Sequence, residues 1–123
     1  MSVDYDMTRQ NGFALVRARG VFESPGGVTR MIDEVAATVG TMAEKRVLLD
    51  FREMNKPNLT LFDKYDIVSH FDKNNDQRRI KWALVVPPQR LKPVRDFETM
   101  ITNRGYLFLA FSSMAEAESW LTH

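Results

Sequence analysis

Asp63, Asp66 and His70 have the residue types and the spacing of a metal-binding helix face. Asp66 and His70 are four residues apart and Asp63 lies three residues before Asp66, so a helix brings all three toward one side. A zinc site needs further strong ligands in register. The chain has two His, of which the second is the C-terminal His123, and it has no Cys. We therefore interpret Asp66 and His70 as a surface charge pair and predict that the chain binds no metal.

Asp50 and Glu53 are the carboxylates best placed for acid–base chemistry. They lie at the carboxyl end of a predicted strand, at the edge where open α/β sheets bind ligands. General acid–base catalysis needs a second group of tuned pKa within reach, and the sequence identifies none. No nucleophile elbow and no Ser, His and Asp spacing stands out, and the absence of Cys removes a thiolate nucleophile. We predict that the protein is not an enzyme and that it uses no cofactor.

Two features of the chain have residue types that bind anions. The segment Ser24–Gly27 lacks the Gly-Lys-Ser/Thr of a P-loop and the glycine spacing of a dinucleotide-binding loop, so helix capping is its favoured role. Basic residues form two clusters at opposite ends of one predicted strand, namely Arg78, Arg79 and Lys81, and Arg90, Lys92 and Arg95. The formal net charge of +1 gives no global attraction for a polyanion. We predict solvated basic surfaces and no nucleic-acid partner.

Met54, Tyr65 and Trp82 are candidates for the lining of an apolar ligand pocket beneath the helix that contains Tyr65. The chain has seven Met, two Trp, three Tyr and eight Phe. Most side chains of these types fill the core of a domain. Core packing and pocket lining therefore both remain open for these three residues.

A strand at Lys45–Phe51 organises the elements that must position these residues. Its run Val47-Leu48-Leu49 does not alternate with polar residues, which is typical of a strand buried on both faces of a parallel sheet. We predict further strands near Tyr5–Thr8, Phe13–Phe22, Ile80–Val86 and Leu107–Phe111, with helices after Ser24, from Thr60, from Pro93 and after Ser113. This alternation predicts an α/β fold with a single-layer, mostly parallel five-stranded sheet flanked by about four helices.

Turn and cap residues mark the ends of these elements. Asn11-Gly12 suits a tight hairpin turn between the first two strands. Ser24-Pro25 suits a helix start, and Gly40 and Gly105 suit helix ends. A full capping box is present at the last helix, formed by Ser113 and Glu116.

Thr60 and Asp63 form a variant capping box at the helix that follows the organising strand. Asp63 stands three residues after Thr60, where a Glu is usual. The predicted apolar stripe of this helix consists of Leu61, Tyr65, Val68 and Phe71.

Length and composition predict one domain over residues 1–123. A chain of this size buries about two-thirds of its unfolded surface, so it needs no disulfide or metal to hold a core. The N-terminal residues have neither a basic start nor an apolar run, and no stretch approaches the length of a membrane span. We therefore expect a cytoplasmic protein.

The chain from Lys45 onward resembles the SpoIIAA-like, or STAS-like, family of small bacterial domains. The resemblance covers about two-thirds of the chain by position, with the same order of elements. It is carried by the strands Val47–Phe51 and Trp82–Val86, by Arg95, Phe97 and Glu98, by Asn103, Arg104 and Gly105, and by Phe111 followed by Glu116, Ala117, Trp120 and Leu121. The resemblance implies a SpoIIAA-like fold and a non-enzymatic regulatory binding module.

The resemblance also implies a partner surface at the loop and helix start around residues 58–63, including Asn58, Thr60 and Asp63. In the STAS group a Ser or Thr at this helix start is phosphorylated, and the phosphate decides whether a protein partner binds. Thr60 is the hydroxyl at the matching place, but Lys56–Thr60 replaces the Asp-Ser-Ser-Gly-like signature, so plain capping by Thr60 is the alternative. The SpoIIAA-like branch implies instead a small apolar ligand or a membrane-surface lipid, and a homodimer also remains open.

Overall fold

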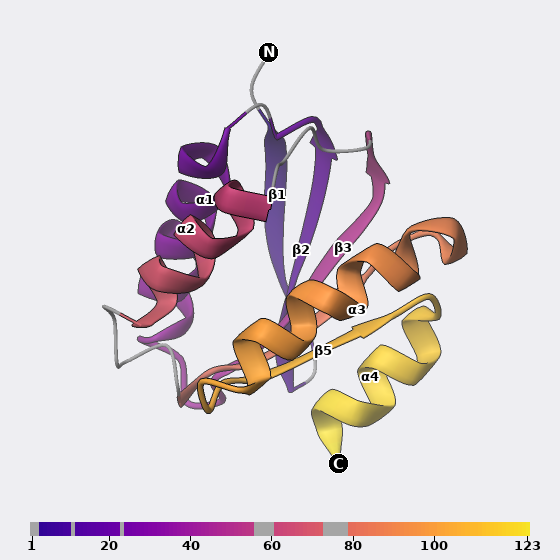
Figure 1. Ribbon diagram of the computed structural model, residues 1–123. Coiled ribbons are helices and arrows are strands. Elements are labelled where there is room, and N and C mark those ends of the chain that lie inside the picture. Colours follow the sequence, from indigo (N-terminus) through magenta and orange to yellow (C-terminus); the bar gives the residue numbers. More distant parts are fainter. Residues whose placement is uncertain (1–2, 11, 23, 56–60, 73–78) are drawn as a thin grey trace.

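The computed structural model describes residues 3–10, 12–22, 24–55, 61–72 and 79–123. Within these ranges the chain forms five strands and four helices, with an N-terminal hairpin followed by alternating helices and strands (Figure 1). The elements are β1 (Asp4–Gln10), β2 (Phe13–Gly20), α1 (Pro25–Val39), β3 (Arg46–Met54), α2 (Leu61–Asp72), β4 (Lys81–Val85), α3 (Pro88–Thr102), β5 (Leu107–Phe111) and α4 (Met114–Thr122).

The strands form one sheet in the order β1-β2-β3-β4-β5. β1 pairs antiparallel with β2, and every other neighbouring pair is parallel. The predicted five-stranded, mostly parallel sheet is therefore confirmed. The predicted organising strand is the central one, because β3 lies between β2 and β4, and Val47, Leu48 and Leu49 are at most 2% exposed.

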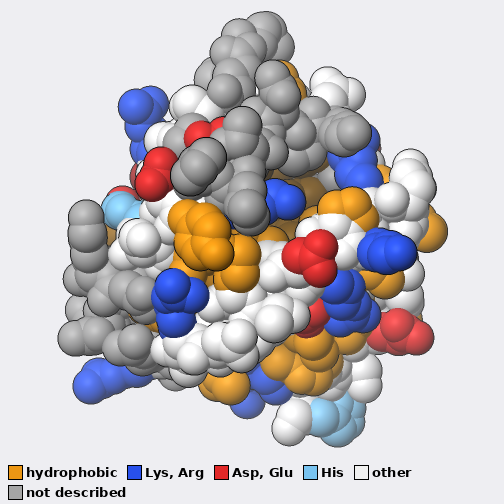
Figure 2. All heavy atoms as spheres, in the orientation of Figure 1, with side chains coloured by type: hydrophobic (Ala, Val, Ile, Leu, Met, Phe, Trp, Pro, Cys, Tyr) orange, Lys and Arg blue, Asp and Glu red, His pale blue; other side chains and the backbone are white. Residues whose placement is uncertain are grey.

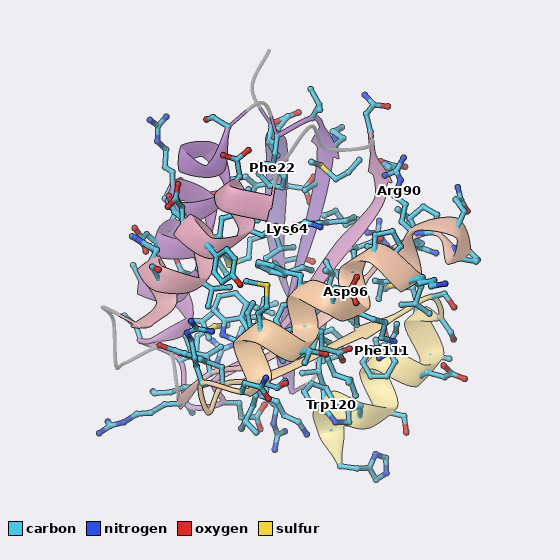
Figure 3. The ribbon with its side chains drawn as sticks, in the orientation of Figure 1. Phe22, Lys64, Arg90, Asp96, Phe111 and Trp120 are labelled. Carbon is cyan, nitrogen blue, oxygen red and sulfur yellow. The ribbon has the colours of Figure 1, made fainter. Side chains whose placement is uncertain are left out.

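The two faces of the sheet are covered unequally. α1, α2 and α3 pack on one face, where their apolar side chains join those of all five strands in the larger core. α4 packs on the other face, where Ala117 and Leu121 contact a smaller cluster around Leu48. The ring centre of Phe111 on β5 lies 5.9 Å from the ring centre of Trp120 on α4, and this contact packs α4 against β5 (Figure 3).

β3 extends three residues beyond the predicted strand. Arg52, Glu53 and Met54 were expected in a polar connecting segment, but Glu53 pairs with Arg19 and Met54 pairs with Gly20 of β2. The ladder shifts register between Arg17 and Arg19. Backbone pairing with a neighbouring strand thus outweighs the polar composition of this segment. The extension places Met54 at the carboxyl end of the central strand.

The helix ends correct the predicted start of α3 and confirm the cap positions Ser24 and Gly40 of α1. α3 begins at Pro88 and not at Pro93, because Pro88 fits the first helical position and Pro93 lies inside the helix. Gly40 follows α1 but keeps right-handed helical angles, so its N–H bonds back to Ala36 without a left-handed cap. Ser24 is the N-cap residue of α1 without a capping bond from its side chain.

Other turn and cap predictions agree with the structure. Gly105 follows α3 with φ of +87°, and Gly12 follows β1 with φ of +95°. The hydroxyl of Ser113 accepts a hydrogen bond from the N–H of Glu116 at the start of α4. The hairpin residue Asn11 lies outside the described residues.

The buried face of α2 agrees with the predicted stripe at Val68 and differs from it at Tyr65. Ile67 and Val68 are buried in the larger core, whereas Tyr65 is 50% exposed. The side chains of Leu61 and Phe71 lie outside the described part. Ile67 and Val68 pack into the larger core. This tertiary contact sets the rotation of the helix about its axis. None of the helices that the structure describes is long and apolar enough to cross a membrane.

Candidate functional site

An apolar cavity of about 250 Å³ opens at the carboxyl ends of β3 and β4. Its walls come from α1, α2 and α3 and from the ends of the strands beneath them. The residues that line it are Phe22, Val28, Phe51, Met54, Asn55, Lys64, Ile67, Leu84, Val86, Arg90, Pro93, Val94 and Phe97. We call this space the apolar cavity. Figure 2 shows hydrophobic side chains around a Lys or Arg side chain at the centre of this face.

The sequence builds the walls of the apolar cavity from strand alternation and helix spacing. Along β3, Leu49 and Phe51 point toward the larger core, and the ring of Phe51 lies 5.8 Å from that of Phe22. On α3, Val94 and Phe97 are three residues apart and share one side of the helix. These side chains lie at the carboxyl edge of the sheet, where α1, α2 and α3 leave space between them that no described side chain fills.

Two cations line the apolar cavity. Lys64 extends from α2 and Arg90 comes from the first turn of α3, and both line the cavity. Figure 3 labels the two side chains. A guanidinium nitrogen of Arg90 donates a hydrogen bond to the carbonyl of Met54 at the end of β3. This bond ties the start of α3 to β3 and holds the guanidinium at the rim.

Sequence reasoning did not identify Lys64 or Arg90 as site residues. Lys64 stands three and four residues before Ile67 and Val68, so it lies on the buried side of α2. A lysine on the inward-facing side of a helix is the sequence signal that could have identified Lys64. Reading that signal requires knowing which side of α2 faces the core. Arg90 was counted with a basic surface cluster, and only the folded chain brings it to the end of β3.

The three predicted pocket residues occupy different places. Met54 lines the apolar cavity. Trp82 is fully buried in the larger core and is not among the cavity-lining residues. Tyr65 is half exposed on α2 and is also absent from the lining. The structure therefore brings Met54 to a cavity beneath α2 but does not bring Tyr65 and Trp82 there with it.

Of the three predicted partner-surface residues, the structure describes Asp63. Asn58 and Thr60 fall outside the described residues, and α2 begins at Leu61, directly after them. Asp63 is half-buried in the first turn of α2, where a carboxylate interacts favourably with the helix dipole. The predicted capping bond between Thr60 and Asp63 lies outside the described part of the chain.

A second recess lies on the opposite face of the sheet, and we call it the arginine recess. It is lined by Asp6, Arg17, Ala18, Arg19, Asp50, Arg52 and Glu53. The carboxylate of Asp50 is buried and accepts hydrogen bonds from the side chain and the backbone N–H of Arg52 at 2.9–3.2 Å. Arg17 approaches the same carboxylate at 3.8 Å.

Opposing effects act on the pKa of Asp50. Burial raises this pKa, but the hydrogen bonds from Arg52 and the charges of Arg52 and Arg17 outweigh burial and hold it below its usual range. Asp50 therefore stays ionised and paired. A paired carboxylate of low pKa is a poor general base. Asp50, one of the two sequence candidates for acid–base chemistry, is therefore the centre of a structural ion-pair site, and Glu53 lines the same recess.

The histidine of α2 pairs with a different acid from the one predicted. Nε2 of His70 lies 2.8 Å from a carboxylate oxygen of Asp33 on α1. The sequence paired His70 with Asp66 because they are four residues apart on one helix, whereas the packing of α2 against α1 supplies the closer partner. Among the described residues, no group of three or more His, Asp or Glu side chains could hold a metal ion.

Basic residues of the two predicted clusters have local partners. Nζ of Lys81 donates to the carbonyl of Trp120 and lies 4.3 Å from the centre of its ring. Burial, followed by the charge of Arg46, lowers the pKa of Lys81. Arg95 pairs with Glu98, and Arg78 lies outside the described residues.

Comparisons with known proteins identify the fold. No family model matches the sequence, and no curated protein matches it. Solved structures do match over nearly the whole of both chains. An anti-sigma factor antagonist from Mycobacterium paratuberculosis has a TM-score of 0.66 at 8% identity, and the match covers 99% of this chain and 96% of that one.

Two further structures have the same architecture. An uncharacterised protein with a SpoIIAA-like fold from Shewanella loihica has a TM-score of 0.56 at 16% identity, covering 98% of this chain and 94% of that one. The anti-sigma factor antagonist SpoIIAA, in its unphosphorylated form, has a TM-score of 0.56 at 11% identity, covering 97% and 98%. The chain therefore has the SpoIIAA-like fold that its sequence predicts.

Proposed function

We propose that this domain is a non-enzymatic regulatory module that binds a protein partner through the segment 58–63 and the exposed side of α2. Two of the solved structures with this fold are anti-sigma factor antagonists, and they match the chain from end to end. This is the observation that carries the proposal. The paired state of Asp50, the best candidate base, is consistent with a role without catalysis.

The exposed side of α2 offers a contact surface next to this segment. Tyr65 is 50% exposed, and Asp66 and Ser69 are also exposed on the same helix. Exposed aromatic side chains are enriched at the centres of protein interfaces, and a polar rim around them is usual. We propose that Tyr65 is an anchor of the partner interface, in place of the pocket role that its sequence position suggested.

Thr60 is the candidate phospho-acceptor of this surface. A phosphate immediately before α2 would add negative charge beside the first turn, which already carries Asp63. The added charge would change docking of a partner directly. Intact-mass measurement of protein purified from its own host, before and after phosphatase treatment, tests for the modification.

Capture experiments test the partner surface. Tagged wild-type protein and the Thr60→Glu variant would be returned to the native host, and co-purified proteins would be quantified by mass spectrometry. The matched control is Ser119→Glu, because Ser119 is exposed on α4 on the other face of the sheet. We expect Thr60→Glu and Tyr65→Ala to lose a partner that wild type and Ser119→Glu retain. Equal capture by all four proteins would refute the proposed surface.

A second candidate function is the carriage or sensing of a small apolar ligand or of a membrane-surface lipid. The observation that favours it is the apolar cavity, which has Met54 and Ile67 in its walls and about 250 Å³ of space. Native mass spectrometry of protein from its own host, under gentle conditions, tests it. A bound small-molecule adduct is expected, and consistently adduct-free protein would count heavily against carriage.

A further inference from the structure

We propose that the apolar cavity binds a single-chain carboxylic acid, with the hydrocarbon body among the apolar walls and the carboxylate facing Lys64 and Arg90. This inference rests on the second candidate function and adds the chemical class of the ligand. Three observations carry it, namely the apolar walls, the charge of the rim and the volume of the cavity.

The walls require an apolar body. Among the described lining residues, all the side chains except those of Asn55, Lys64 and Arg90 are apolar. Side chains that border empty space lose contacts on that side, and an apolar ligand restores those contacts. Water in such a space would find few hydrogen-bond partners, because a buried water needs several.

The rim requires a negatively charged head group. Lys64 and Arg90 are the charged residues among the described lining, and no Asp or Glu accompanies them. No carboxylate in the described part of the chain forms an ion pair with Lys64 or Arg90. Half-buried cations beside apolar surface lose hydration, and an anion that hydrogen-bonds them replaces it.

Arg90 is held in a position to bind such a head group. Its guanidinium already donates to the Met54 carbonyl, which fixes the side chain at the end of β3. A guanidinium carries further N–H donors beyond the one used in this bond. Lys64 approaches from the opposite helix (Figure 3). A carboxylate at the opening therefore has a fixed donor on one side and an adaptable ammonium on the other.

The volume limits the length of the apolar body. A cavity of about 150 Å³ holds one benzene molecule. By proportion, the 250 Å³ of the apolar cavity accommodates about ten carbon atoms. This size suits one medium-length chain and is too small for the two acyl chains of a phospholipid. Decanoate is therefore the probe, and 1-decanol is its neutral counterpart of equal chain length.

Calorimetric titration of the purified full chain with decanoate and 1-decanol tests the proposal. We expect decanoate to bind about tenfold more tightly than 1-decanol, because a charge-assisted hydrogen bond contributes about that factor. Lys64→Met keeps the aliphatic stem and removes the charge, so it should weaken decanoate about tenfold and leave 1-decanol unchanged. The matched control is Lys92→Met, because Lys92 is exposed on α3 outside the lining. It should change neither ligand.

Different failures have different meanings. Equal binding of decanoate and 1-decanol, or unchanged decanoate binding by Lys64→Met, would overturn the acid head group and leave apolar-ligand carriage standing. No binding of either molecule would overturn both. Val94→Phe, which places a ring into the cavity, should abolish binding while the protein remains folded, and retained binding would place the ligand elsewhere and overturn the assignment.

A vesicle experiment separates a free acid from a membrane lipid. Sedimentation with phosphatidylglycerol vesicles supplies an anionic head group on two acyl chains. We expect no Lys64-dependent co-sedimentation. If vesicles bind the chain in a Lys64-dependent manner and decanoate does not, the proposal of a free single-chain acid is wrong and a membrane surface is the source of the anion.

Discussion

The apolar cavity and the arginine recess share strand β3 and lie on opposite faces of the sheet. β3 serves both, because Phe51 and Met54 line the first while Asp50 and Arg52 line the second. Alternation of side chains places Phe51 opposite Asp50 and Arg52, and the register shift that follows brings Met54 to the side of Phe51. The two surfaces differ in whether their charged side chains already have ion-pair partners within the protein.

In the arginine recess the charges are matched by the protein itself. Asp50 is bound by Arg52 and approached by Arg17, and Arg19 is bound by Asp6. A ligand there would have to displace these partners. In the apolar cavity, empty volume and cations without carboxylate partners among the described residues leave interactions for a ligand to make. On this basis we propose the less charged of the two recesses as the binding site.

The largest effect should come from placing extra volume on each face. Val85 is fully buried in the smaller core beneath α4, so Val85→Phe should lower the free energy of unfolding by about 3 kcal/mol through overpacking. Val94→Phe adds the same atoms beside the apolar cavity. It should change the free energy of unfolding by less than about 1 kcal/mol. Urea denaturation of both variants provides the test. Similar losses would mean that the cavity is closed to added volume.

Removing the buried carboxylate of the arginine recess should have the next largest effect. Asp50 is 6% exposed and organises two arginines, so Asp50→Ala should lower the free energy of unfolding by about 2 kcal/mol. Asp6→Ala is the matched control, because Asp6 lines the same recess but is solvent-exposed, and it should cost less than about 0.5 kcal/mol. Equal costs in urea denaturation would mean that the recess is not organised around Asp50.

The order of elements and the central strand were predictable because both depend on short-range patterns. The uninterrupted run Val47-Leu48-Leu49 indicates burial on both faces, and Ser113 and Gly105 mark a helix start and a helix end through local backbone chemistry. Each of these signals is read within a few residues. Tertiary contacts reinforce them and do not reverse them.

The site was less predictable because it depends on how elements pack together. The rotation of α2 decides that Lys64 faces the cavity and Tyr65 faces solvent. A shift of one residue in the apolar stripe rotates the helix face by about 100° and reverses such an assignment. His70 pairs across helices with Asp33, which no sequence spacing reveals. A cavity is the space that packing leaves, so no residue pattern encodes it directly.

The acid side of the stability curve should also distinguish the two recesses. The pKa of Asp50 is below its unfolded value, so its contribution to stability is complete above about pH 4 and is lost as pH falls through the folded pKa. Urea denaturation from pH 2 to pH 6 should show a decline that Asp50→Asn makes shallower. Lys64→Met, on the other face, should keep the wild-type decline. An unchanged slope in Asp50→Asn would assign the acid sensitivity to other carboxylates.

The smallest effect should come from the outer ion pairs of the arginine recess. Arg19 contacts Asp6 at 3.0 Å and Asp4 at 3.6 Å, but all three side chains are well exposed. A double-mutant cycle of Arg19→Met and Asp6→Ala should give a coupling energy below about 0.5 kcal/mol in dilute buffer, and about 1 M salt should remove it. The equivalent cycle of Arg52→Met and Asp50→Ala should keep most of its coupling in salt, because Asp50 is buried. If both cycles gave coupling energies of equal size and equal salt sensitivity, the distinction between the buried Asp50 pair and the exposed Arg19 pairs would be wrong.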